Sequence, residues 1–272
     1  MLNVKIFVCI KQVPGVSEVK IDPKTNTLVR EGIPSIVNPH DKHAIELGIS
    51  IREKYGGEVI ALSMGPPQAE TALREALAMG ADKAYLLTDR AFAGADTLAT
   101  SHTLALGIKK LLKDLDKKEN YIVICGTQAI DGDTAQVGPE LAEELNIPQI
   151  TYVLKFELKE NNKILVERAF RTEEVVLIET KLPALISVLK ELNIPRNPGV
   201  KGMVEAYSKK QVISLTAEDL KVDKSELGLN GSQTEVWRIF VPQRKGEHIM
   251  LEGTIEKMSQ DLCRNLREDK VI

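Results

Sequence analysis

Residues 125–148 read Cys-Gly-Thr-Gln-Ala-Ile-Asp-Gly-Asp-Thr-Ala-Gln-Val-Gly-Pro-Glu-Leu-Ala-Glu-Glu-Leu-Asn-Ile-Pro and join an apolar run to a helical pattern through a donor-rich turn. Gly126 and Gly132 let the backbone of this turn approach a ligand closely. We expect Asp133 to cap a helix that begins at Thr134. The N–H groups of a first helical turn lack partners and lie at the positive end of the macrodipole. The turn is therefore predicted to hold a nucleotide phosphate.

The alternation of apolar runs and helical patterns extends through the first half of the chain. Predicted strands are 4–10, 58–63, 84–87 and 121–125, and predicted helices are 40–55, 67–79, 96–113 and 134–145. This order indicates an α/β fold with a doubly wound, mostly parallel sheet of the Rossmann-like, adenine-nucleotide-binding type. Ligands bind beyond the carboxyl ends of the strands in such sheets. We therefore expect four loops to converge at that edge: 9–13, 38–41, 63–66 and 126–133.

The second half of the chain has a different pattern. Short apolar runs at 150–156, 164–170, 175–179 and 185–189 are separated by polar turns. They predict an antiparallel meander that continues the same domain. From about residue 193 prolines and glycines replace the periodicity, which indicates an extended arm laid on a partner. The chain beyond about Ser214 is therefore expected to be dispensable for folding of the α/β domain.

A last helix is predicted near the carboxyl terminus. Apolar residues follow one another there at helical spacing, at Ile255, Met258, Leu262 and Leu266. This spacing gives an amphipathic helix with one apolar stripe.

Composition excludes several classes of function. With a formal net charge of -3 and 4% aromatic residues, the chain lacks the basic surface and the stacking platforms of nucleic-acid-binding proteins, so no nucleic-acid partner is expected. No apolar run is long enough for a signal peptide or a membrane span, and we expect a cytoplasmic protein without membrane insertion. The three cysteines form no CxxC pair, which indicates neither a disulfide framework nor a cysteine-rich metal site.

Local motifs alone leave the role of the turn open. It lacks the Gly-Lys-Ser/Thr of a P-loop, and no Gly-x-Gly-x-x-Gly follows the first strand. From its residues the turn is either a nucleotide site or only a tight turn with a cap. His40 and His43 lie one helical turn apart, as in some metal sites, but helix starts are commonly rich in Asp and His, and we assign no metal ligand. The four histidines form no triad, and we assign no catalytic residue.

Several segments, in order along the chain, resemble one known family. The stretch Gly-Thr-Gln-Ala-Ile-Asp-Gly-Asp-Thr-Ala-Gln-Val at 126–137 is similar to the adenine-nucleotide loop of the β subunit of electron transfer flavoproteins. The further similar segments are Val-Cys-Ile-Lys-Gln-Val at 8–13, Val-Asn-Pro-His-Asp at 37–41, Ala-Leu-Ala-Met-Gly-Ala-Asp at 76–82, Lys-Leu-Pro-Ala at 181–184 and Asn-Ile-Pro-Arg at 193–196. The resemblance runs from residue 1 to about residue 215, which makes it more specific than a lone glycine motif.

The loop also resembles one branch of that family. Members that hold AMP as a structural ligand usually read Asp-Asp-Asp around the position of Gly132, whereas this chain reads Asp-Gly-Asp-Thr-Ala at 131–135. In this respect it looks like the electron-bifurcating branch, in which the β subunit binds a second FAD in place of AMP. Gly132 and Ala135 also remove side-chain volume at the mouth of the site, so that a diphosphate and flavin can extend beyond the adenosine.

The resemblance implies the β subunit of a heterodimeric, electron-bifurcating electron transfer flavoprotein. FAD would accept a hydride from NADH, and the electrons would pass singly to ferredoxin or flavodoxin and, through the FAD of the α subunit, to an acyl-CoA dehydrogenase-like partner. The chain would thus be an electron carrier with NADH-oxidising flavin activity inside a larger oxidoreductase complex. Two alternatives stay open: a non-bifurcating β subunit with structural AMP, and, from another class, a free-standing nucleotide-binding or nucleotide α-hydrolase-like protein.

The resemblance also implies which residues form the site. The implied cofactor contacts are Cys9, Asn38, Pro39, His40, Asp41, Met64, Gly126, Thr127, Gln128, Ala129, Ile130, Asp131, Gly132, Asp133, Thr134, Ala135, Gln136 and Val137. Residues 196–205, from Arg196 to Glu205, correspond to the recognition loop on which the dehydrogenase docks. The implied domains are an α/β nucleotide- and flavin-binding domain at 1–192 and, at 193–272, the recognition loop, a partner-wrapping arm and the C-terminal helix.

Overall fold

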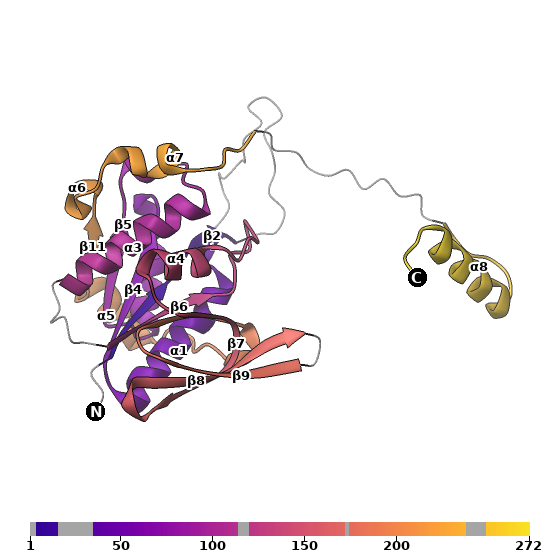
Figure 1. Ribbon diagram of the computed structural model, residues 1–272, viewed down its shortest axis with the longest axis horizontal. Coiled ribbons are helices and arrows are strands. Elements are labelled where there is room, and N and C mark those ends of the chain that lie inside the picture. Colours follow the sequence, from indigo (N-terminus) through magenta and orange to yellow (C-terminus); the bar gives the residue numbers. More distant parts are fainter. Residues whose placement is uncertain (1–3, 16–34, 114–119, 172–173, 238–248) are drawn as a thin grey trace. The chain divides into compact units, whose positions relative to one another are not determined.

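The computed structural model describes residues 4–15, 35–113, 120–171, 174–237 and 249–272 (Figure 1). The strands of its main sheet are β1 (Val4–Cys9), β4 (Glu58–Met64), β5 (Lys83–Leu87), β6 (Asn120–Gly126), β7 (Gln149–Lys159), β8 (Lys163–Arg171), β9 (Glu174–Lys181), β10 (Ala184–Val188) and β11 (Val212–Leu215). Their order is β11-β5-β4-β1-β6-β10-β7-β8-β9. Every pair from β11 to β7 is parallel, and β7, β8 and β9 are antiparallel. The predicted α/β class with a mostly parallel sheet is confirmed.

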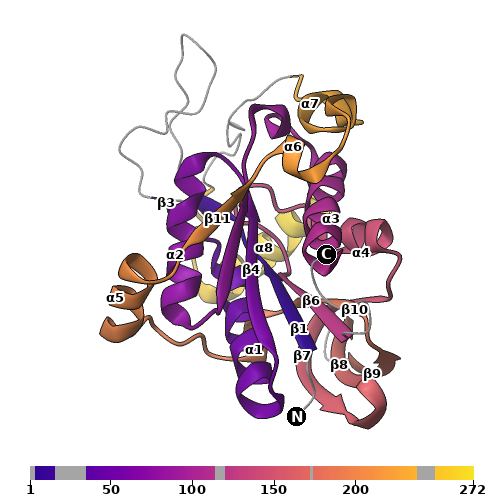
Figure 2. The same ribbon diagram turned by 90° about the vertical axis from the view of Figure 1, so that its left-hand side faces the viewer.

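Helices cover both faces of the parallel part. The main helices are α1 (Pro39–Tyr55), α2 (Glu70–Met79), α3 (Thr97–Lys113) and α4 (Val137–Leu145). Alternate residues of β1 enter two different cores: Ile6 packs with residues of α1 and α2, and Phe7 packs with residues of α3 and α4. Figure 2 shows α2 on one side of the strands and α3 and α4 on the other. The central strands read as continuous apolar runs because both of their faces are buried.

The remaining short elements lie mostly in the connections. They are β2 (Gln12–Pro14) and β3 (Ser35–Val37), which pair antiparallel, the 3-10 turns η1 (Pro67–Ala69), η2 (Arg90–Phe92), η3 (Glu160–Asn162), η4 (Lys190–Leu192) and η5 (Lys224–Glu226), and the helices α5 (Val200–Ser208), α6 (Ala217–Leu220), α7 (Gly228–Gly231) and α8 (Ile255–Glu268). None of the helices among the described residues has both the length and the apolar character that crossing a membrane requires.

The predicted four-stranded meander is wrong in its last strand. β10 does not continue the antiparallel part but enters the sheet between β6 and β7, parallel to both. All five residues of β10 are buried, as expected of a central parallel strand rather than of a half-exposed one. Strand β7 changes partner near Tyr152, which has φ 59°. Residues 149–153 of β7 pair with β10 and residues 153–159 pair with β8, and the register of each pairing shifts close to Tyr152. A local pattern of short apolar runs carries no information on which strands pair, so it could not predict this change of partner.

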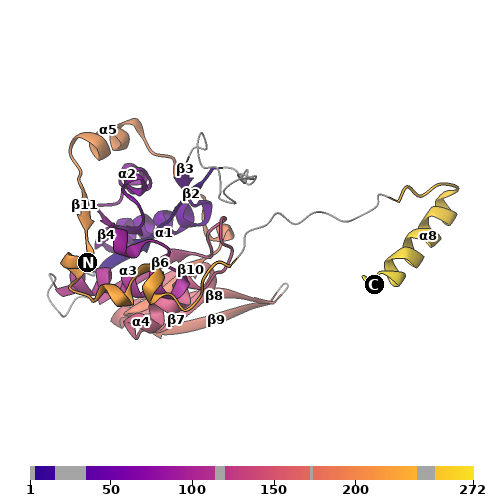
Figure 3. The same cartoon turned by 90° about the horizontal axis from the view of Figure 1, so that it is seen from above.

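The chain after residue 193 is more regular than its sequence predicts. α5 packs beside α2 (Figure 3), so closely that a Cβ on Gly202 would lie 2.3 Å from the carbonyl oxygen of Ala78. β11 then adds a parallel edge strand to β5, and Leu227 is only 1% exposed. This arrangement argues against the expectation that residues beyond Ser214 are dispensable for folding. Tertiary packing forms these elements although Gly202 lies within α5 and Gly228 and Gly231 lie within α7; Pro195 and Pro198 precede α5 in the connection.

The division of the chain also differs from the expected boundary at 192/193. The structure separates one compact unit, Met1–Val236, from a second, Trp237–Ile272. In the second unit α8 confirms the predicted C-terminal helix, and Thr254 caps it by accepting a hydrogen bond from the N–H of Lys257. No residue of α8 is buried. Part of the predicted arm, residues 238–248, lies outside the described residues.

Candidate functional site

The strand ends that carry the predicted site meet at one edge of the sheet. Cys9 at the end of β1 is in register with Leu62 of β4 and with Cys125 of β6. Gly126, the last residue of β6, is in register with Val188 of β10. The loops after β1, β4 and β6 therefore leave the sheet at the same level, as expected for the ligand-binding edge of a parallel sheet.

The loop after β6 has a different conformation from the predicted one. α4 begins at Val137 rather than at Thr134, because Asp133 and Ala135 have φ values of 51° and 55°, which a right-handed helix excludes. Asp133 is therefore not a helix cap, and its carboxylate accepts a hydrogen bond from Nε2 of Gln128 at 2.9 Å. No side chain caps the start of α4. The first N–H groups of the helix are thus left for water or for an anionic ligand.

Asn38 ties this loop to the start of α1. Its side chain is 1% exposed, its Nδ2 donates to the carbonyl oxygen of Gln128 at 2.9 Å, and its Oδ1 accepts from the N–H of Ile130 at 3.2 Å. Pro39 follows as the first residue of α1, where its missing N–H has no cost. Asn38 therefore fixes the loop through two hydrogen bonds to its backbone.

Asp41 lies below the loop and connects it to the end of β1. The residue is 6% exposed, and its carboxyl group accepts from the N–H of Lys11 at 2.7 Å and is also hydrogen-bonded to the backbone of Gly126 and the side chain of Asn38. A Cβ on Gly126 would lie 2.3 Å from Oδ1 of Asp41, so only glycine permits this packing. Burial raises the pKa of Asp41 to about 7, against the opposing effect of these hydrogen bonds.

Two further contacts close the loop on its sides. The hydroxyl of Thr127 donates to the carbonyl oxygen of Val188, and Nζ of Lys11 lies 2.8 Å from the carboxylate of Asp131. Lys11 was missed by the sequence analysis, although a lysine directly after a buried first strand is a signal for a cation at this edge. The tip of the loop is exposed, and no atom lies within 4 Å of the position of a Cβ on Gly132.

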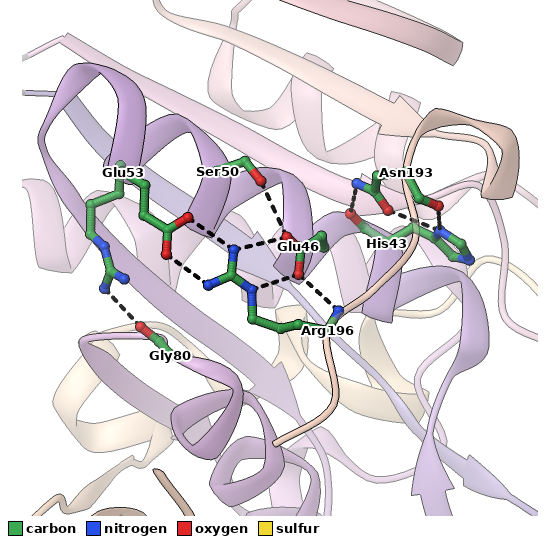
Figure 4. A network of polar contacts seen from close by, with 8 residues as sticks. His43, Glu46, Ser50, Glu53, Gly80, Asn193 and Arg196 are labelled. Atoms are coloured by element: carbon green, nitrogen blue, oxygen red, sulfur yellow. Dashed lines mark hydrogen bonds and ion pairs between the residues drawn. The ribbon is translucent and has the colours of Figure 1, made fainter. Parts of the chain in front are cut away.

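His40 has a buried nitrogen without a partner among the described residues. Its Nδ1 makes no hydrogen bond, and burial together with the nearby His43 lowers the pKa of His40. An orphaned buried nitrogen beside the loop is the kind of group that a bound ligand satisfies. His43 contacts Asn193 through its Nδ1 at 3.0 Å (Figure 4), and no group of three metal-binding side chains occurs within the described part of the chain.

Cys9 and Met64, two further predicted contacts, lie at the ends of β1 and β4. Cys9 and Cys125 are buried side by side, and a hydrogen bond with the Cys9 thiol, together with burial, holds the pKa of the Cys125 thiol well above its ordinary value. Met64 is half-buried at the end of β4 and packs against the core on the side of α3 and α4. The structure thus brings the predicted residues together at one edge, and their contact with a cofactor stays a prediction.

A separate network fixes residues 193–196 on α1 (Figure 4). Arg196 donates through Nε and Nη2 to the carboxylate of Glu46, and through Nη1 and Nη2 to that of Glu53, at 2.7–2.9 Å. Its backbone N–H also donates to Glu46. Burial alone would raise the pKa of Glu46, but the hydrogen bonds and charge of Arg196 lower it. Arg196 therefore anchors the predicted recognition loop and does not point to a partner.

Replacing Arg196 with alanine is expected to lower the free energy of unfolding at pH 7 by about 2 kcal/mol, because Glu46, 8% exposed, then keeps Ser50 alone among the described residues as a side-chain partner. The pKa of Glu46 is lower in the folded than in the unfolded protein. This stabilisation is therefore fully present above the pKa of Glu46 in the unfolded chain and is lost as the pH falls through its pKa in the folded protein. Urea unfolding at pH 7 and near pH 3 measures the difference. The control Glu53→Gln, at a more exposed carboxylate, should cost about 0.5 kcal/mol; equal losses in both variants would contradict the assignment.

The fold and this edge define a doubly wound α/β protein with a loop suited to an anionic ligand. A model of the electron transfer flavoprotein domain matches residues 25–220. A protein of Thermoanaerobacterium thermosaccharolyticum named electron transfer flavoprotein subunit beta is 56% identical over 267 residues, 98% of this chain and 99% of that protein. A protein of the same name from Clostridium acetobutylicum is 49% identical over 267 residues, again 98% of this chain and 99% of that protein. The chain belongs to the family of electron transfer flavoprotein β subunits.

A further relative bears a more specific name. Subunit CarD of a caffeyl-CoA reductase-Etf complex from Acetobacterium woodii is 48% identical over 271 residues, 98% of this chain and the whole of that protein. Family membership confirms the resemblance seen in the sequence. It also argues against the alternative of a free-standing nucleotide-binding or nucleotide α-hydrolase-like protein.

Proposed function

We propose that this chain is the flavin-binding β subunit of an electron-bifurcating electron transfer flavoprotein and pairs with an α subunit. The observation that carries the proposal is the uncapped start of α4 beside the open space around Gly132. Unpartnered N–H groups at a helix start bind phosphate, and the open space leaves room for a ligand longer than AMP. The orphaned Nδ1 of His40 adds a polar group without a protein partner at the same edge.

The chain's own residues would bind and orient the cofactor. The N–H groups at the start of α4 and the ammonium of Lys11 would hold the diphosphate, while Asn38 and Asp41 would keep the loop in shape. Bound FAD would supply the ability to take two electrons from NADH and to release them one at a time. No side chain of the site needs to act as an acid or a base, so the role of the protein is positioning and electrostatics.

The proposed partners follow from the same assignment. One electron would pass to ferredoxin or flavodoxin, and the other, through the FAD of the α subunit, to an acyl-CoA dehydrogenase-like flavoenzyme. The name of the Acetobacterium woodii relative, which belongs to a complex with a CoA-ester reductase, supports such a partner. The second unit, Trp237–Ile272, would contact the α subunit, since Trp237 is exposed and none of the described residues buries the apolar stripe of α8.

The experiment that tests the proposal is a count of cofactors. The chain is co-expressed with its α subunit, and FAD and AMP are quantified per heterodimer after denaturation. We expect two FAD and no AMP. One FAD and one AMP would overturn the proposal and select the non-bifurcating alternative, in which this subunit carries AMP as a structural ligand.

We infer that the dehydrogenase docks on the segment from Arg196 to Glu205, which consists of the connection 196–199 and the first part of α5. Gly202 fixes α5 against α2, while Val200, Val204 and Tyr207 are exposed. Aromatic and aliphatic anchors of this kind commonly dominate a small transient interface. Arg196 holds the segment in place through Glu46 and Glu53 and would not itself touch the dehydrogenase.

Replacing Val200 with alanine should weaken dehydrogenase binding about tenfold. Val200 is 75% exposed in this chain, and burial of its two lost methyl groups in the complex is worth about 1.5 kcal/mol. Dehydrogenase-coupled turnover at limiting partner concentration measures the effect. Reduction of the flavin by NADH in the isolated heterodimer should keep its rate, because α5 lies outside the nucleotide loop.

The matched control for this prediction is Val175→Ala on β9, another exposed valine. It should leave coupled turnover unchanged. A parallel fall of both rates in Val200→Ala would show that the segment belongs to the flavin site or to the fold, and the docking assignment would have to be abandoned.

A further inference from the structure

Asp41 is a buried carboxyl group at the junction of three loops, all of which belong to the candidate nucleotide edge. It accepts the N–H of Lys11 after β1, is hydrogen-bonded to the backbone of Gly126 at the end of β6, and lies on the first turn of α1 beside Asn38. The resemblance assigns it a direct contact with the cofactor. Because Asp41 is buried and contacts the backbone of these loops, we expect it to affect the ligand through the loops rather than by touching it.

Within the described part of the chain, the groups that face Asp41 include one cation. They are the Lys11 residue after β1, the amide of Asn38, and the Cys125 thiol of β6, whose pKa is raised in part by Asp41 itself. His40 is the neighbouring residue on α1, and burial lowers its pKa, so it is neutral at pH 7. The ammonium of Lys11 is directed to Asp131 at 2.8 Å. The carboxylate of Asp41 is therefore stabilised mainly by neutral donors.

We propose that Asp41 is a positioning residue that links binding of the nucleotide's phosphates at the loop 126–136 to uptake of one proton. The inference rests on the proposed function, in that the ligand is taken to be an adenine nucleotide and in particular FAD. An anionic diphosphate on the loop brings negative charge towards a buried carboxylate. Like charges in a poorly solvated site disfavour each other, so occupancy favours the neutral form of Asp41.

The direction of the pH dependence follows from linkage. Burial already raises the pKa of Asp41 to about 7 in the ligand-free chain, and the bound anion raises it further. Below both pKa values Asp41 is neutral with or without ligand, and the affinity does not depend on pH. Between them binding takes up a proton, so the affinity falls as the pH rises, at most about tenfold per pH unit.

The test is calorimetric titration of FAD into the flavin-depleted heterodimer between pH 6 and pH 9, in buffers of different ionisation enthalpy. The diphosphate of FAD does not titrate in this range, so proton uptake reports the protein. We expect uptake of about 0.6 proton near pH 8 and a fall of affinity of about tenfold between pH 7 and pH 9. Absence of uptake by the unmodified heterodimer would overturn the proposal.

Variants assign the proton to its residue. Asp41→Asn should abolish the uptake and flatten the affinity profile, whereas Asp41→Glu, which keeps a titratable carboxyl, should restore both. The matched control Glu53→Gln removes an exposed carboxylate near the other end of α1, away from the nucleotide loop, and should retain the uptake. Uptake that persists in Asp41→Asn would overturn the proposal; if that variant does not fold, loss of uptake in Glu53→Gln would overturn it instead.

The outcome is separable from that of the proposed function. If the heterodimer binds AMP in this subunit and no FAD, the FAD assignment fails. The same titration with AMP between pH 7 and pH 9, where its phosphate is already a dianion, then tests the proton linkage on its own. If FAD or AMP binds tightly but its affinity does not change with pH, the proposed role of Asp41 is refuted and the proposed function is not.

Discussion

Replacing Gly126 with alanine is expected to weaken FAD binding about 100-fold and to lower the free energy of unfolding by about 2 kcal/mol. The added Cβ would lie 2.3 Å from Oδ1 of Asp41 and 2.7 Å from the carbonyl carbon of His40. One of these is a buried carboxyl and the other is backbone, so neither can move without displacing the end of β6 or the start of α1. The displacement would break the two hydrogen bonds by which Asn38 holds the backbone of the loop, each worth about 1.5 kcal/mol. Flavin content after dialysis and urea unfolding measure the two effects.

Gly132→Ala is the matched control in the same loop. No other part of the chain lies within 4 Å of the position of its Cβ, so the variant should change the free energy of unfolding by no more than about 0.5 kcal/mol. A Gly126→Ala variant with the affinity and stability of the unmodified chain would show that packing of Gly126 on Asp41 does not shape the site. Equal losses of stability in the two variants would show that the loop merely needs glycine for flexibility.

Truncation after Val236 and truncation after Lys210 should have opposite consequences. A chain ending at Val236 keeps the whole compact unit and should retain its melting temperature while losing stable association with the α subunit. A chain ending at Lys210 loses β11 and the buried side chains of Leu215 and Leu227. At about 1.5–3 kcal/mol for each large apolar side chain, the loss is about 5 kcal/mol, which equals the whole free energy of unfolding of a single domain at the lower end of the usual range.

Lost polar contacts add to the effect of the shorter truncation. Asp89 accepts from the N–H of Ala217, and Asp96 accepts from the N–H groups of Gln233 and Thr234, so both carboxylates lose partners. Circular dichroism melting of the two chains, with gel filtration in the presence of the α subunit, decides the question. Equal melting temperatures would contradict the assignment of residues 211–236 to the core, and co-elution of the 1–236 chain with the α subunit would contradict the proposed role of the second unit.

The sequence determined the alternating α/β order and the place of the site within it. The strands β1, β4, β5 and β6 appear in the sequence as apolar runs because burial on both faces of a parallel strand leaves no polar alternation. The loop 126–137 stands out because glycines and small polar residues between such a strand and a helix meet the requirements of a phosphate site. The family was recognisable for the same reason, since several motifs of this kind occur in order.

Tertiary structure alone decided how these pieces pair and which residues support the loop. The insertion of β10 between β6 and β7 and the addition of β11 beside β5 depend on contacts between segments far apart in the chain, which no local periodicity records. The start of α4 at Val137 depends on left-handed backbone at Asp133 and Ala135, which the anchored loop imposes, in the case of Ala135 against the preference of the residue.

Asp41 illustrates the same limit at the site. In the sequence it is a polar residue at a helix start and therefore resembles a ligand contact. Only the fold places its carboxyl group below Gly126 and beside the backbone of Lys11, where water is excluded. Desolvation of a charge is a property of its surroundings in three dimensions, so the sequence determined which residues stand at the nucleotide edge and the tertiary structure decided what each of them does there.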